Sequence, residues 1–346
     1  MRSPSVALIF CVALVVFNCG KQTVRQFTNP LLPTGPDPWV THYNGMYYIT
    51  HSTGKNLKLY RTRSVSDLAQ AESKVVWTPP ATGMNSREIW APELHRINNK
   101  WYFYYAADDC NNHNHRMWVV ENSNDDPFEG EWVDKGRLNL PNDKWAIDGS
   151  IFEHEGSLYF VWSGWEGDVN VRQDIYITRM IDPWTPDSTR VLLSKPELPW
   201  EIKGASEELP TVNEGPQFLK HGNKIFIVYS ASGCWTDDYS LGMLEASAGA
   251  DLMNASSWTK SQQPVLQKDA EAHAFGAGHN SFFRSPDGTQ DWIIYHANPE
   301  AGQGCRDFRS PRMQPFTWDS DDRPVFGKPV KVGELLAVPA GESESK

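Results

Sequence analysis

One pattern recurs five times along the chain: a turn containing Gly or Asn, followed by an aromatic-rich strand that ends in a small residue. The copies read NGMYYITHS at 44–52, NNKWYFYYA at 98–106, EGSLYFVWS at 155–163, HGNKIFIVYS at 221–230 and, with inserted residues, DGTQDWIIYHA at 287–297. β-forming residues on both sides of a tight turn indicate a β-hairpin. Evenly repeated hairpins predict an all-β chain folded as a five-bladed β-propeller over residues 27–335, with one blade per repeat. A β-sandwich is the alternative, but it has no need of evenly spaced copies.

The composition agrees with many short strands and narrows the choice of partner. Aromatic residues make up 12% of the chain, and 25 Gly and 24 Pro favour turns over long helices. The net charge of −11 disfavours nucleic acid and anionic membranes, which bind proteins through Lys and Arg. We therefore expect a neutral partner such as a sugar, no nucleic-acid or membrane partner, and a monomer.

The two ends of the chain are expected to lie outside the propeller. Residues 1–20 carry one Arg and then an apolar stretch from Val6 to Phe17, which is the length of a secretory signal peptide and too short to span a bilayer. A buried N-terminal strand is the alternative. The sequence thus predicts a secreted, extracellular protein. Residues 336–346 are expected to form a disordered tail.

Three cysteines, Cys110, Cys234 and Cys305, remain beyond the signal segment. Three cannot all pair internally, so one disulfide with a free thiol and three buried thiols are both open. Asn254 begins the sequon Asn-Ala-Ser and is the candidate glycosylation site.

The repeat also predicts where a site lies. The first strand of each blade lines the central channel of a propeller, so equivalent positions on these strands converge at its axis, where we expect the active site. Eight residues before the turn, or nine in the fifth copy, the chain carries two Asp, one Glu, one His and one Ala: Asp37, Ala91, Asp148, Glu214 and His279.

Three carboxylates in one partly desolvated pocket repel one another, so each must be hydrogen-bonded or protonated. Glycoside hydrolysis needs such groups: an acid that protonates the leaving oxygen, and a base or nucleophile on the other face of the sugar. The pKa of the acid must be raised by burial or by a neighbouring carboxylate. Calcium binding is the competing use, because calcium prefers oxygen ligands.

The residues around these positions resemble glycoside hydrolase family 43. The matching stretches are GPDPWV at 35–40, WAPELH at 90–95, AIDGSIF at 146–152, NEGPQFLK at 213–220 and GAGHNSFF at 276–283. The resemblance implies an inverting hydrolase with Asp37 as general base, Glu214 as general acid, and Asp148 raising the pKa of the acid and holding it in place. For an inverting pair we expect the two catalytic carboxyl groups to lie about 6.5–9.5 Å apart.

The same resemblance implies further site residues. Trp90, its neighbour Ala91, and Trp39 would contact the sugar, and Arg309 would hydrogen-bond its hydroxyls. Arg312 either shares that role or, as we expect, pairs with a surface acid. His279 would order the channel centre or help to hold a structural calcium there, although neutral His suits calcium poorly. No cofactor is expected to be required.

The expected substrate follows from sequence stretches outside the axial positions, which resemble one branch of the family, and not from the residues that would contact the sugar. HRMWVVEN at 115–122, PFEGEWVDKG at 127–136, WEIKG at 200–204 and SSWTKS at 256–261 resemble the exo-acting α-L-arabinofuranosidase branch of the family. This implies release of terminal α-L-arabinofuranosyl residues from plant cell-wall arabinan or arabinoxylan. A β-xylosidase, an endo-arabinanase and a non-catalytic sugar-binding propeller are the alternatives. An intact set of acid and base favours an enzyme, because a lectin has no need of it.

Overall fold

The computed structural model describes residues 25–342, and over this range the chain is all-β. The only helical segments in this range are three 3-10 turns, η1 (Val65–Gln70), η2 (Asn112–Asn114) and η3 (Ala255–Ser257). No helix within residues 25–342 is long and apolar enough to cross a membrane. The predicted signal peptide, residues 1–20, lies outside the described residues.

The strands follow the five predicted hairpins. The first unit contains β2 (Trp39–Tyr43), β3 (Met46–Thr50), β4 (Leu57–Thr62) and β5 (Glu72–Trp77). The second contains β6 (Arg87–Ile97), β7 (Lys100–Asp108), β8 (Arg116–Asn122) and β9 (Val133–Arg137). The third contains β10 (Ala146–His154), β11 (Ser157–Gly164), β12 (Arg172–Asp182), β13 (Thr185–Pro186) and β14 (Val191–Ser194). The fourth contains β15 (Thr211–His221), β16 (Lys224–Ala231), β17 (Ser240–Ser247) and β18 (Thr259–Lys260). The fifth contains β19 (Phe275–Arg284), β20 (Asp291–Asn298), β21 (Ser310–Trp318) and β22 (Pro324–Val325).

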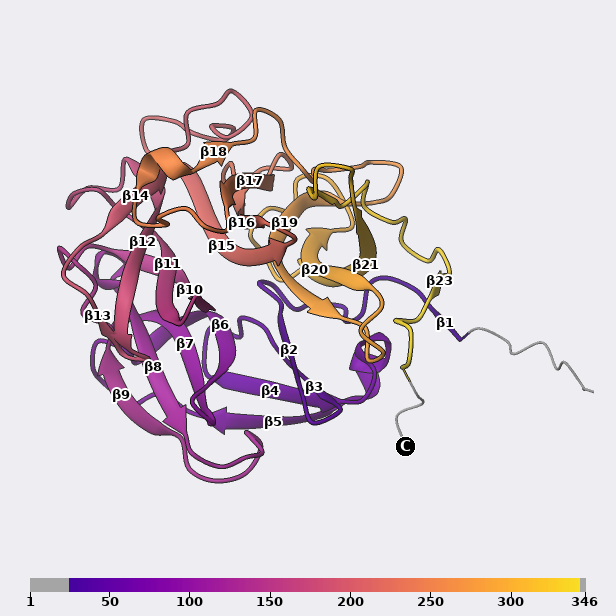
Figure 1. The fold of residues 1–346 in the computed structure, drawn as a ribbon, viewed down its shortest axis with the longest axis horizontal. Coiled ribbons are helices and arrows are strands. Elements are labelled where there is room, and N and C mark those ends of the chain that lie inside the picture. Colours follow the sequence, from indigo (N-terminus) through magenta and orange to yellow (C-terminus); the bar gives the residue numbers. More distant parts are fainter. Residues whose placement is uncertain (1–24, 343–346) are drawn as a thin grey trace, which may run out of the picture.

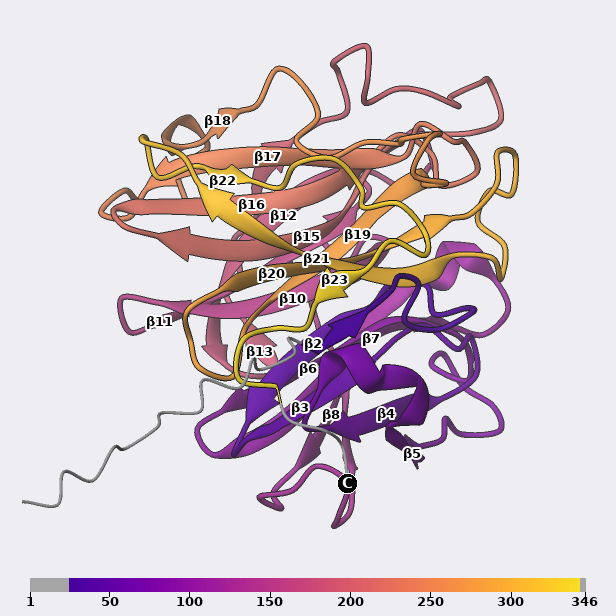
Figure 2. The ribbon, with the colours of Figure 1, turned by 90° about the vertical axis from the view of Figure 1, so that its right-hand side faces the viewer.

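These units follow one another around a common centre (Figure 1). The first strand of each unit contacts the first strand of the next: β2 with β6, β6 with β10, β10 with β15, β15 with β19, and β19 with β2 again. Apolar side chains fill the space between neighbouring units, and the set that includes Val40 and Ile294 joins the fifth unit back to the first. In the perpendicular view the long strands run across the molecule and loops project at both ends (Figure 2).

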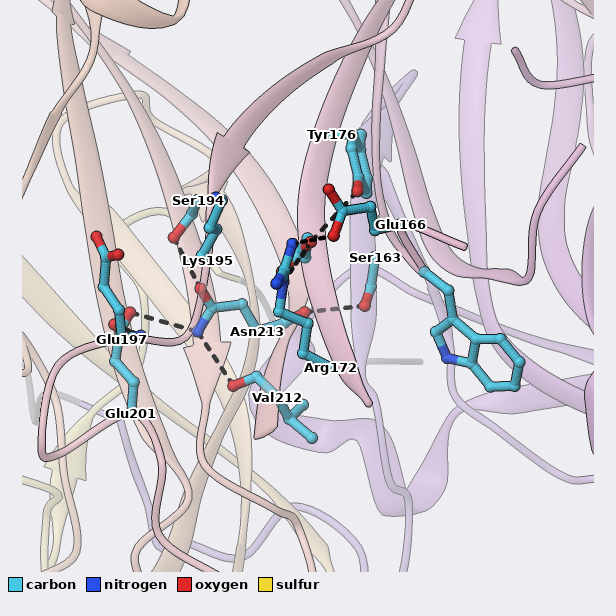
Figure 3. Close-up of polar contacts among 12 residues, drawn as sticks. Ser163, Glu166, Arg172, Tyr176, Ser194, Lys195, Glu197, Glu201, Val212 and Asn213 are labelled. Carbon is cyan, nitrogen blue, oxygen red and sulfur yellow. Dashed lines mark hydrogen bonds and ion pairs between the residues drawn. The ribbon is translucent and has the colours of Figure 1, made fainter. Parts of the chain in front are cut away.

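The third and fourth units form one nine-stranded sheet, whereas the first, second and fifth are separate four-stranded sheets. The connection is a short parallel pairing of β12 with β15, at Arg172 with Thr211 and Gln173 with Val212. A buried polar network around Asn213 supports this junction (Figure 3). Asn213 accepts hydrogen bonds from the Ser163 hydroxyl at its carbonyl and from the Ser194 hydroxyl at Oδ1, and donates one to Glu201. The network therefore fixes the backbone directly before Glu214.

The C-terminal segment corrects one expectation. Residues 336–342 were expected to belong to a disordered tail, but β23 (Leu336–Ala337) pairs with β1 (Gln26–Phe27). Further along, the Glu342 carboxylate accepts hydrogen bonds from the Ser64 hydroxyl and from the Val65 amide. Sequence polarity suggested fraying at this end, yet these contacts tie it to the first unit. Residues 343–346 lie outside the described part of the chain.

Candidate active site

The backbone turns the predicted axial residues toward the centre by a shared device. Asp37, Ala91, Asp148 and His279 all have a positive φ, between 40° and 58°. In the fourth unit the residue with positive φ is Gly215, one position after Glu214, at 56°. The pairing register shifts at this place in β6, β10, β15 and β19, as in a β-bulge. Bulges re-aim side chains, and left-handed non-glycine residues concentrate at functional sites because their strain must be supported by the surroundings.

Asp37 lies in a setting that keeps it ionised. Its Oδ1 is 3.1 Å from Nη1 of Arg309 and 3.3 Å from Nδ1 of His279, and its Oδ2 accepts a 2.6 Å hydrogen bond from the Ser52 hydroxyl. Its backbone amide donates to Nδ1 of His296 at 3.1 Å. Burial alone would raise the pKa of Asp37, but the Arg309 cation, His279 and the other partners together hold that pKa well below its usual range.

Glu214 and Asp148 have the opposite electrostatics. Burial is the largest cause that raises the pKa of Glu214, to about 7, and the negative charge of Asp37 adds to it, whereas the hydrogen bond from the Tyr239 hydroxyl acts against it. That hydrogen bond is 2.8 Å long and ends on Glu214 Oε1. Burial and then the charge of Glu214 raise the pKa of Asp148 well above its usual value. Asp148 Oδ2 also accepts a hydrogen bond from the amide of Gly215, the residue after Glu214, so the Asp148 carboxyl group is tied to the backbone that carries Glu214.

Three side chains at this place could also hold a metal ion. Asp148, Glu214 and His279 each offer one donor atom, and the three atoms lie within 4.8 Å of one another. Calcium prefers six to eight oxygen ligands, whereas one of these three donors is a nitrogen. A cation bound to Glu214 would also displace the proton that burial keeps there, because a nearby positive charge lowers a carboxyl pKa. A donor set of two carboxylates and one imidazole nitrogen therefore fits a directly bound calcium ion poorly.

The predicted sugar-contacting residues are partly occupied by protein contacts. Trp90 is half-buried, with its ring stacked 4.1 Å from that of His115 and its indole N–H bonded to Glu88. The amide of Ala91, which is buried, donates to the Ser52 hydroxyl. Trp39 is half-buried, packs its ring at a tilt against that of His95 with the ring centres 4.5 Å apart, and donates its indole N–H to the Leu94 carbonyl.

The two arginines lie in different surroundings, and the binding of sugar hydroxyls by Arg309 stays a prediction. Arg309, predicted to bind sugar hydroxyls, pairs with Asp37 while 17% of its side chain stays exposed. Arg312 was expected to pair with a surface acid, and this is wrong. It lies inside β21 opposite Tyr295, is fully buried, and none of its guanidinium nitrogens has a hydrogen-bond partner within the described chain. The misplacement arises because a charged residue in an inner strand was assigned to the surface from its type alone.

The remaining predictions concern a sugar attachment site and the cysteines. Asn254 is exposed and caps η3 through a hydrogen bond from the Ser256 amide to its Oδ1, and its glycosylation stays a prediction. Cys234 and Cys305 form a disulfide, and Cys110 is an exposed free thiol. The arrangement with one disulfide and a free thiol is therefore the one present.

Several site residues escaped the sequence reasoning. Ser52 and Ser230 are the last residues of two of the repeated sequence segments, and each accepts a hydrogen bond from the innermost segment of the next unit: Ser52 from the Ala91 amide, and Ser230 from the His279 amide. The recurrent small residue at the end of each repeated strand was the available signal. Glu93, buried and bonded to His95 and to Gln217, stood inside a recognised motif. No such pattern pointed to Tyr239.

Asp37, which is buried, and Glu214, which is half-buried, are neighbouring carboxyl groups whose pKa values are shifted in opposite directions, and this is the arrangement with which two-carboxylate glycosidases work. The geometry thus places the protein in that class of acid–base site. The sequence model of the family described as Glycosyl hydrolases family 43 matches residues 27–324, and the chain belongs to this family.

Individual relatives agree with this assignment. The chain is 38% identical over 316 residues to a protein of Streptomyces avermitilis named extracellular exo-α-(1→5)-L-arabinofuranosidase, covering 89% of this chain and 64% of that one, so it spans less than two thirds of that relative. A protein of the same name from Streptomyces chartreusis is 38% identical, covering 78% of this chain and 82% of its own. The crystal structure of an α-L-arabinofuranosidase from Lactobacillus brevis superimposes with a TM-score of 0.82 at 35% identity, covering 89% of this chain and 98% of that one.

Proposed function

We propose that this protein is an inverting glycoside hydrolase that releases terminal α-L-arabinofuranosyl residues. The observation that carries the proposal is the contrast between Asp37, whose pKa is held low, and Glu214, whose pKa is raised to about 7. At a pH between the two pKa values, Asp37 is ionised and Glu214 is protonated. These are the states that a general base and a general acid must have before the reaction.

In the proposed reaction both proton transfers accompany one displacement. Asp37 accepts a proton from a water molecule, whose oxygen forms the new bond to the anomeric carbon from the face opposite the leaving group. Glu214 donates its proton to the glycosidic oxygen as the bond from that oxygen to the anomeric carbon breaks. Asp148 orients the acid and shares its proton. The products are a sugar of inverted anomeric configuration and a free hydroxyl on the remaining glycan, and the predicted carboxyl separation of about 6.5–9.5 Å belongs to this proposal.

The proposed architecture is a five-bladed β-propeller with the active site at its axis. Its support is the five repeated units, the contacts that run from β2 through β6, β10, β15 and β19 back to β2, and the apolar layers between successive units. In this architecture the short parallel pairing of β12 with β15 joins the edges of two separate blades by backbone hydrogen bonds, and each blade keeps its own sheet.

The substrate and setting are proposed from the relatives. Their names specify exo action on α-(1→5)-L-arabinofuranosyl linkages and an extracellular location. We propose a secreted monomer, led by the signal segment 1–20, that acts on plant cell-wall arabinan or arabinoxylan. We further propose that no cofactor is required, and that His279 orders Asp37 through their 3.3 Å contact instead of ligating calcium.

Hydrolysis of aryl glycosides tests the activity. Wild type is expected to cleave an aryl α-L-arabinofuranoside far faster than an aryl β-D-xyloside. Absence of turnover on both would reject the proposed function, and a preference for the xyloside would reject the sugar assignment.

The assignment of the acid has a separate test. Glu214→Gln cannot donate the proton, so it should lose most activity on arabino-oligosaccharides while sparing substrates whose leaving group needs no protonation. Glu131→Gln, at an exposed position far from the carboxyl pair in sequence, is the matched control and should behave as wild type. Oligosaccharide hydrolysis that survives in Glu214→Gln would show that another group is the acid.

A further inference from the structure

The Cys234–Cys305 disulfide joins two loops, each of which brings one polar partner to a catalytic carboxylate. Cys234 lies in the loop between β16 and β17, five residues before Tyr239. Cys305 lies in the loop between β20 and β21, four residues before Arg309. The bridge therefore links the fourth unit to the fifth beside the site.

The two partners act on different carboxylates. Tyr239, which is buried, donates its hydroxyl hydrogen bond to Glu214 Oε1 at 2.8 Å and stacks on His296. Arg309 places Nη1 3.1 Å from Asp37 Oδ1. Tyr239, which contacts the proposed acid Glu214, and Arg309, which contacts the proposed base Asp37, thus lie on separate loops.

The loop that carries Arg309 has little burial to hold it. Residues 305–308 are exposed, and within this stretch the Arg309 amide and Nε each donate a long hydrogen bond of 3.4 Å to the Arg306 carbonyl. The Gly302 amide bonds to Asp237 of the other loop, the Gly304 carbonyl accepts from Asn298, and the Arg309 carbonyl accepts from Gly35. An exposed loop loses much conformational entropy when it is held in one geometry, and a covalent cross-link removes part of that cost.

We propose that the Cys234–Cys305 disulfide is a positioning element of the active site, which holds Tyr239 on Glu214 and Arg309 on Asp37 at the same time. This inference rests on the proposed function for its catalytic consequence. Opening the bridge lets the exposed loop move, and a displacement of about 1 Å at a positioning group can lower a rate about 100-fold.

The expected consequence differs from that of a purely structural cross-link. Asp37 is faced by Arg309, His279 and His296, and Glu214 by Tyr239, Asp148, Asp37 and Arg309. Release of Arg309 removes a cation from Asp37, and release of Tyr239 removes a hydrogen bond that favours ionised Glu214. Both changes raise the pKa of the carboxyl group concerned, so both limbs of the pH–rate profile should move to higher pH.

The test compares the double variant Cys234→Ser/Cys305→Ser with Cys110→Ser, which removes the exposed free thiol and is the matched control. On arabino-oligosaccharides the double variant should lose about 10- to 100-fold in kcat with a smaller change in KM, and both limbs should shift upward. Cys110→Ser should retain the wild-type profile. Should the double variant fail to fold, reduction of folded wild type with dithiothreitol should give the same shift, reversed on reoxidation.

An unchanged pH profile in the opened protein, even with a lower kcat, would overturn the inference and leave the disulfide as a stabilising cross-link. The outcome for the proposed function is separate, because wild type inactive on every glycoside would reject that function alone. In that case NMR titration of the Glu214 and Asp37 carboxyl carbons in oxidised and reduced protein still decides the inference. A higher pKa of both groups after reduction supports it, and unchanged values refute it.

Discussion

Removal of the Tyr239 hydroxyl gives the sharpest quantitative prediction. Its 2.8 Å hydrogen bond to Glu214 is one that favours the ionised carboxylate, so Tyr239→Phe should raise the pKa of Glu214 above about 7. Hydrogen bonds to charged groups contribute about 1.5–3 kcal/mol, and one pKa unit corresponds to about 1.4 kcal/mol, so the shift should be about one to two units. Because Glu214 must be protonated to act, the alkaline limb of kcat/KM should move to higher pH by that amount.

The assay is a pH profile of kcat/KM on an arabino-oligosaccharide, whose poor leaving group makes the rate depend on the acid. Tyr295→Phe is the matched control, because Tyr295 is also buried in the fold but donates its hydroxyl bond to Gln314. It should destabilise the protein without moving the alkaline limb. An alkaline limb that stays in place in Tyr239→Phe, or moves to lower pH, would refute the assignment of Glu214 as the group that must remain protonated.

Three other perturbations have expected outcomes. Arg309→Met removes the cation 3.1 Å from Asp37, so the pKa of Asp37 should rise and the acid limb of kcat/KM should move to higher pH; an unmoved acid limb would contradict the role of Asp37 as base. Ser52→Ala removes the 2.6 Å bond to the same carboxylate and should shift the acid limb in the same direction, but less. Exhaustive treatment with EDTA should leave kcat and the thermal midpoint unchanged, and loss of activity restored by calcium would overturn the proposal that no metal is required.

The axial residues could be located from the sequence because the repeat fixes backbone geometry. Counting back from each hairpin turn reached Asp37, Asp148 and His279, all of which have positive φ, because the left-handed turn of the backbone lies at the same distance before the hairpin in these units. In the fourth unit the count reached Glu214, while the left-handed conformation lies at Gly215. A Cβ at Gly215 would stand 3.3 Å from the His279 ring, so the glycine also provides close packing.

Features that depend on pairs of distant loops escaped prediction. Tyr239 reaches Glu214 from a loop whose course no periodic pattern describes. The pairing of Cys234 with Cys305 depends on how loops of neighbouring units meet, so three cysteines left two arrangements open. Arg312 was misassigned because residue type predicts exposure on average, whereas its place in β21 opposite Tyr295 determines its burial.

The most direct test of the central account follows the first-formed sugar anomer by NMR during hydrolysis of an aryl α-L-arabinofuranoside. With Asp37 activating water and Glu214 protonating the leaving group, the α-linked substrate should first release β-L-arabinose, which then mutarotates. Release of the α anomer first would mean a retained configuration and would contradict the proposed base-and-acid pair.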